Sequence, residues 1–173
     1  MFDDWENFYL IVGSVAGALI GLMFVVATLM AGLESDRVSH RARVFFSPII
    51  FHFAVVVIVS AIAVVPGMRA PVAGVIVSSC AVTGFAYAIA TIFRMFGPGS
   101  GDPLHWTDKY FYGVVPAIVY LGLAVAAGAT WFMPGSAAYA IGATMLILLL
   151  IGIRDAWDMA VCLLQGSRER APR

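Results

Sequence analysis

Residues 110–153 read YFYGVVPAIVYLGLAVAAGATWFMPGSAAYAIGATMLILLLIGI, a run of 44 residues without Asp, Glu, Lys or Arg. A helix needs about 20 apolar residues to cross a hydrocarbon core about 30 Å thick, so this run is long enough for two crossings. Proline removes a helical hydrogen-bond donor, and glycine relaxes the backbone. We therefore expect the chain to turn back at Met133-Pro134-Gly135-Ser136, which divides the run into spans at 110–132 and 137–153.

Three further runs without charged residues lie upstream, at 7–33, 44–68 and 70–93, and each is long enough for one transmembrane helix. The 173-residue chain is 62% hydrophobic and 12% charged, whereas soluble domains are about half apolar and about a quarter charged. A soluble protein of this size could not bury so much apolar surface. We therefore predict an all-α integral membrane protein, one domain over residues 1–173, with spans at about 8–32, 44–65, 71–94, 110–132 and 137–153.

The basic residues predict the orientation of this five-helix transmembrane bundle, because cytoplasmic loops carry an excess of Lys and Arg. With five spans, only Arg69 falls on the outer side. Four spans would instead place the four C-terminal arginines outside. We therefore predict the N-terminus out and the C-terminus in, with nine basic residues inside: Arg37, Arg41, Arg43, Arg94, Lys109, Arg154, Arg168, Arg170 and Arg173.

Small residues recur at intervals of four in the first span, where Gly13, Gly17 and Gly21 form a glycine zipper. Helices associate in lipid by close backbone approach, which small residues permit. The motif fits either packing inside the bundle or the seam of a homo-oligomer. Gly122 and Ala126 repeat the pattern in the fourth span, so we expect helix packing there as well.

The third span carries polar side chains on one helical face: Ser79, Thr83, Tyr87 and Thr91, followed by Arg94. A polar face within hydrocarbon is expected to turn toward protein or water. One interpretation is hydrogen bonding between helices. The other is the wall of a hydrated pathway with Arg94 at its inner mouth.

Among Asp, Glu, His, Lys and Arg, His52 is the only residue within the spans that does not lie close to an end. It is about 12 Å deep if the second span starts near Val44. Intramembrane ionisable residues are candidates for function. A histidine can be a neutral packing residue, relay a proton, or bind a metal or haem. We keep these three interpretations open, and we place His52 with the residues that could line a pathway.

The sequence gives little support for a metal site in the loops or for catalysis. The inner loops contain Asp102, His105 and Asp108, and also His40 with Glu34 and Asp36, but this spacing is not an established metal signature. No Walker, Rossmann, HExxH or GxSxG motif occurs. We therefore predict no catalytic residues, no metal and no cofactor.

The inner end of the fifth span continues as an amphipathic extension at 154–165. Arg154 and Asp158 can pair at i,i+4, and Trp157 can anchor the segment at the interface. The extension is either an interfacial helix or a surface where a partner docks through Arg154, Asp155, Trp157 and Asp158.

The opening segment WENFYLIVGS at 5–14, which runs into ALIGLMFV at 18–25, and RDAWD at 154–158 resemble a group of small bacterial inner-membrane proteins with no established activity. The resemblance implies a multi-pass protein of the bacterial inner membrane, and it assigns no site.

Three functional hypotheses follow, and the third, a membrane enzyme or redox carrier, rests on His52 and the loop ligands alone. The first is a non-enzymatic inner-membrane protein that acts by helix–helix assembly, as a homo-oligomer or as an accessory subunit or modulator of a membrane complex. The alternative is a homo-oligomeric ion channel or small-solute conduit, lined by the third-span polar face and His52. The expected partners are the lipid bilayer, further copies of the chain and another membrane protein. A zero net charge with thinly spread arginines gives no surface for nucleic acid.

Overall fold

The computed structural model describes residues 2–31, 36–96 and 113–168. These residues form helices joined by turns, without strands. A short 3-10 helix, Asp3–Trp5, precedes five α-helices: α1 (Glu6–Ala31), α2 (Asp36–Val64), α3 (Ala70–Phe96), α5 (Val115–Ala129) and α6 (Pro134–Arg168). The predicted all-α class is therefore confirmed.

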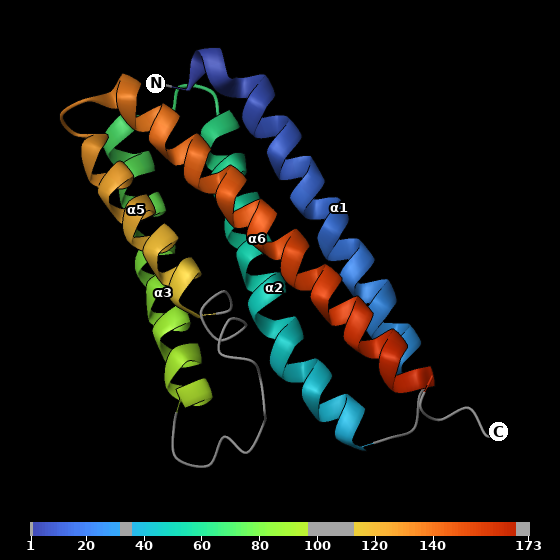
Figure 1. Cartoon of the computed structure of the whole chain (residues 1–173). Coiled ribbons are helices and arrows are strands. Elements are labelled where there is room, and N and C mark those ends of the chain that lie inside the picture. The colour runs from blue at the N-terminus through green and yellow to red at the C-terminus, as the bar shows by residue number, and fades with distance from the viewer. Residues whose placement is uncertain (1, 32–35, 97–112, 169–173) are drawn as a thin grey trace.

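The five helices run alternately up and down along a common direction (Figure 1). Four of them form a ring in which α2 contacts α3, α3 contacts α5, α5 contacts α6, and α6 contacts α2. Helix α1 lies outside this ring and packs on α2 and α6. The ring therefore has an interior that all four helices share, and α1 covers one side of it.

Three helices are long and apolar enough to cross a membrane, over Glu6–Thr28, Ala70–Phe93 and Pro134–Asp158. Two further apolar segments, Pro48–Val64 and Val115–Ala129, are shorter. These lengths and compositions suggest a membrane protein.

The turn between α5 and α6 lies earlier than the sequence analysis predicted. Helix α5 ends at Ala129, the turn occupies residues 130–133, and Pro134 opens α6. The expected boundaries at 132 and 137 are wrong because proline fits the first position of a helix, where its missing N–H has no intrahelical acceptor in any case. Thr130 closes α5 by donating its hydroxyl to the Ala127 carbonyl at 2.7 Å.

Two helices extend beyond the predicted spans. Helix α2 begins at Asp36 and includes Pro48, and α6 continues unbroken to Arg168. The turn from α2 to α3 uses Gly67 with φ of 69°, a left-handed conformation that glycine adopts without steric cost.

The interior of the bundle is packed with large side chains, while much of the outer surface is apolar. Helix α1 buries one narrow face at helical spacing through Tyr9, Val12, Ala16 and Met23. The ring buries Ile49, Phe53, Val56, Val59, Val77, Tyr120, Leu123, Ile141, Met145 and Leu148.

Candidate functional site

A polar pair lies inside the four-helix ring and joins two helices on opposite sides of it. Nδ1 of His52, on α2, lies 2.8 Å from the hydroxyl oxygen of Tyr120, on α5. Both side chains are buried, with 1% and 0% exposed surface. His52 is thus a hydrogen-bonded residue of the bundle interior.

Aromatic rings and a close helix approach enclose this pair. The Phe51 ring stacks on the Tyr87 ring with centroids 4.7 Å apart and lies 6.3 Å from the Tyr120 ring. On α3, Gly84 lies directly against Tyr120, and a Cβ at this position would overlap the phenol ring. The pair therefore occupies a tightly packed, largely apolar environment.

One ring nitrogen of this pair has no partner among the described residues. Nε2 of His52 is buried and makes no hydrogen bond. An unsatisfied buried donor or acceptor costs about 1–3 kcal/mol. The hydroxyl oxygen of Ser60 on α2 is also buried without a hydrogen-bond partner among the described residues.

Asp155 is fully buried, although the sequence analysis grouped it with the exposed docking residues. The helical pattern cannot tell which face of a membrane helix meets the bundle, and here Asp155 faces the interior while Trp157 is 70% exposed. A docking surface on this segment would therefore consist of Arg154, Trp157 and Asp158 without Asp155.

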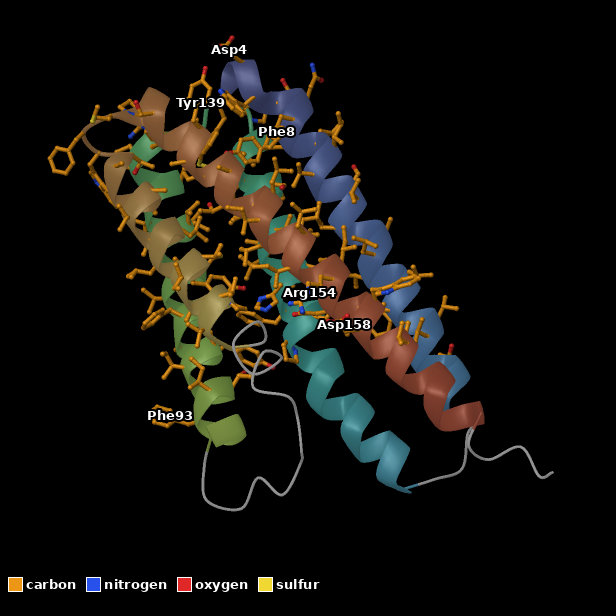
Figure 2. All side chains as sticks on the ribbon, in the orientation of Figure 1. Asp4, Phe8, Phe93, Tyr139, Arg154 and Asp158 are labelled. Carbon is orange, nitrogen blue, oxygen red and sulfur yellow. The ribbon has the colours of Figure 1, made fainter. Side chains whose placement is uncertain are left out.

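Arg154 and Asp158 lie side by side on α6 (Figure 2), and a guanidinium nitrogen is 3.6 Å from a carboxylate oxygen. This is the i,i+4 pair that the sequence suggested. Both side chains are 40% exposed, so the pair lies at the outer surface of the bundle.

The polar stripe of α3 begins at exposed residues and ends at a buried one. Ser79 and Thr83 are exposed, Tyr87 is half-buried and Thr91 is buried. Their hydroxyls bond within their own helix, from Ser79 to Val75, from Thr83 to Ser79 and from Thr91 to Tyr87, at 2.8–3.0 Å. These bonds satisfy serine and threonine without a second helix, which is why Ser79 and Thr83 can face outward. The side chain of Arg94 lies outside the described residues.

The three glycines of the zipper differ in their surroundings. Gly13 faces α2, where an added Cβ would lie 2.8 Å from the Ser60 Cβ. Gly17 and Gly21 are exposed, with nothing within 4 Å of an added Cβ. In α5, Ala126 is buried, and a Cβ on Gly122 would meet Thr144 at 3.7 Å. Only part of the predicted helix-packing set therefore packs within the chain.

The possible loop metal site at Glu34, Asp36, His40, Asp102, His105 and Asp108 lies outside the described side chains. Among the side chains that the structure does describe, no group of three His, Cys, Asp or Glu residues could hold a metal ion.

Two buried residues were missed by the sequence analysis. Tyr120 supplies the partner of His52 from 68 residues away, and Tyr9 donates its hydroxyl to the Ala138 carbonyl at 2.9 Å. A tyrosine in the middle of an apolar run was the available signal, because a buried phenol hydroxyl needs a partner. Figure 2 shows Phe8 and Tyr139 at the end of the bundle where α1 and α6 begin.

The fold and this interior define an all-helical bundle, with helices suited to a membrane and a buried histidine–tyrosine pair. No protein-family model, curated protein or solved structure matches the chain.

Proposed function

We propose that this chain is a multi-pass protein of the bacterial inner membrane that acts without catalysis, by assembling with a second copy of itself through α1. In this proposal all five helices span the bilayer, with the N-terminus outside. The shorter apolar segments of α2 and α5 support this because they lie within the ring beside the two long helices α3 and α6.

The observation that carries the proposal is the open face of α1 at Gly17 and Gly21. Gly13 is needed within the chain because Ser60 lies against it, but nothing in the described structure occupies the space at the other two glycines. Ser14 and Ala18 are exposed beside them. A face of small residues at intervals of four favours the close approach of another helix. A two-fold axis beside α1 would bring the same small residues together from both copies.

The alternative conduit has weaker support. The centre of one chain is filled by His52, Tyr120 and their aromatic neighbours, so a pathway there would have to pass this packed pair. Ser79 and Thr83 could line a pathway only between copies, and their hydroxyls already bond to their own helix.

Native mass spectrometry of the protein released from lipid nanodiscs tests the proposal. We expect a closed homo-oligomer for the unmodified chain and monomers for Gly17→Leu and Gly21→Leu. The control is Gly128→Leu on α5, because Gly128 also has nothing within 4 Å of an added Cβ. It should leave the oligomer intact.

Each other outcome has a clear meaning. If the unmodified chain is monomeric and carries a stoichiometric second membrane protein that Gly17→Leu releases, self-assembly is wrong and the chain is an accessory subunit. If Gly17→Leu and Gly128→Leu both remain oligomeric, the seam lies elsewhere. Unchanged thermal unfolding of the monomeric variants would show that the substitutions act on assembly and not on folding.

A further inference from the structure

The interior of the ring contains a buried polar atom that has no hydrogen-bond partner among the described residues. This observation does not depend on the assembly proposed through α1. Nε2 of His52 is buried where α2, α3, α5 and α6 surround the ring interior. Within a bilayer such an unsatisfied group is especially unfavourable, because no bulk water can reach it.

The hydrogen bond at Nδ1 determines whether Nε2 is a hydrogen-bond donor or an acceptor. If the Tyr120 hydroxyl donates to Nδ1 across the 2.8 Å contact, then Nε2 of the neutral ring carries the hydrogen. In the opposite arrangement Nδ1 donates to the Tyr120 oxygen, which leaves both the phenol hydrogen and the Nε2 lone pair unmatched. The first arrangement leaves fewer groups unsatisfied, so the unmatched group is an N–H donor.

The acceptor for this donor should be small and uncharged. A neutral N–H beside the Phe51 and Tyr120 rings cannot compensate the desolvation of an anion. Water is small, neutral and able to accept this hydrogen bond, and buried waters commonly bridge two to four polar groups.

A second polar group for such a water lies at nearly the same height in the bundle. Gly152 of α6 faces the Phe53 ring of α2. The two helices run in opposite directions (Figure 1). Asp155 comes three residues after Gly152 and His52 comes one residue before Phe53, so both lie toward the same end of the bundle from this contact. At 1.5 Å per residue the difference in height is about 3 Å. The Asp155 side chain is fully buried.

We propose that the ring interior holds an internal water site that joins the Nε2–H of His52 to the carboxyl group of Asp155. Together with the Tyr120 hydroxyl, this site connects three proton-exchanging side chains from α2, α5 and α6. Such a connected group can exchange protons inside the membrane, which the separate side chains could not do. The proposal does not depend on self-assembly, because every residue in it belongs to one chain.

Nuclear magnetic resonance of the full chain in lipid, labelled with ¹⁵N-histidine, tests this site. His52→Gln identifies the His52 signals among those of the three histidines. We expect a neutral ring protonated at Nε2 at pH 7, with magnetisation transfer from water to the Nε2–H. Asp155→Asn should shift the Nε2 resonance, and Asp158→Asn, a change to the half-exposed partner of Arg154 on the same helix, should not.

A ring protonated at Nδ1 alone, or a charged ring, would overturn the donor assignment. Absence of water transfer to Nε2–H in the unmodified protein would overturn the water site, and this measurement needs no variant that must fold. Equal Nε2 shifts in Asp155→Asn and Asp158→Asn would remove Asp155 from the site.

Discussion

Gly84 of α3 lies so close to Tyr120 of α5 that a Cβ on Gly84 would overlap the ring atoms Cε1, Cδ1 and Cζ. The absence of a side chain at position 84 therefore sets how closely α3 approaches α5. It also helps to hold the phenol in the position from which it reaches His52.

Gly84→Ala should destabilise the protein, because the added methyl must displace an aromatic ring in a packed interior. Overpacking of this kind costs about 1–3 kcal/mol. Denaturation of the purified protein in detergent, followed by circular dichroism, measures the change. Gly128→Ala is the matched control because its Cβ meets open space. Equal stability of the two variants would contradict the close packing at Gly84.

The bond between His52 and Tyr120 should appear as a coupling energy in a double-mutant cycle. Tyr120→Phe and His52→Leu each leave the other partner unsatisfied, whereas the double variant removes both polar groups. We expect the double variant to be more stable than the sum of the single effects predicts, by about 0.5–1.5 kcal/mol. Additive effects on the free energy of unfolding would show that the two side chains do not interact.

Tyr9→Phe should weaken the attachment of α1 to α6, because it removes the hydroxyl that donates to the Ala138 carbonyl. The expected loss in free energy of unfolding is about 0.5–1.5 kcal/mol. Tyr139→Phe provides a control from the adjacent position on α6, since the Tyr139 side chain is 65% exposed. If Tyr139→Phe is as damaging as Tyr9→Phe, the buried hydroxyl has no special part in holding α1.

The proposed orientation can be measured by cysteine labelling in intact cells. In a background with Cys80→Ala and Cys162→Ala, a membrane-impermeant maleimide should label Arg69→Cys, in the exposed turn between α2 and α3. It should not label Arg37→Cys, near the start of α2, until the membrane is permeabilised. The reverse pattern would mean that the chain has the opposite orientation.

The sequence was sufficient to predict an all-helical chain with five helices, because each long run without charged residues contains one helix or, at 110–153, two helices. It was misleading at Pro134, where the same residue can end one helix or begin the next. Only the geometry of the turn at 130–133 distinguishes the two roles.

The interior of the site was less predictable than the helices. His52 was recognised from its depth, but Tyr120 is 68 residues away, and a spacing rule within one helix cannot connect them. Asp155 was grouped with exposed docking residues but is buried, whereas Trp157, expected at the interface, is exposed. The helical pattern of α6 alone does not identify which of its faces turns inward. Their exposures follow from which neighbours α6 packs against, namely α1, α2 and α5.

The position of α6 as the last helix of the ring has a consequence for biosynthesis. The hairpins α1–α2 and α3–α5 can form as the ribosome delivers them, because each pair packs together directly. The ring closes only when α6 has packed between α2 and α5. Until that moment the imidazole of His52 and the phenol of Tyr120 lack one of the four helices that surround them. The growing chain therefore contains both members of its polar pair before the helix that completes their enclosure has been made.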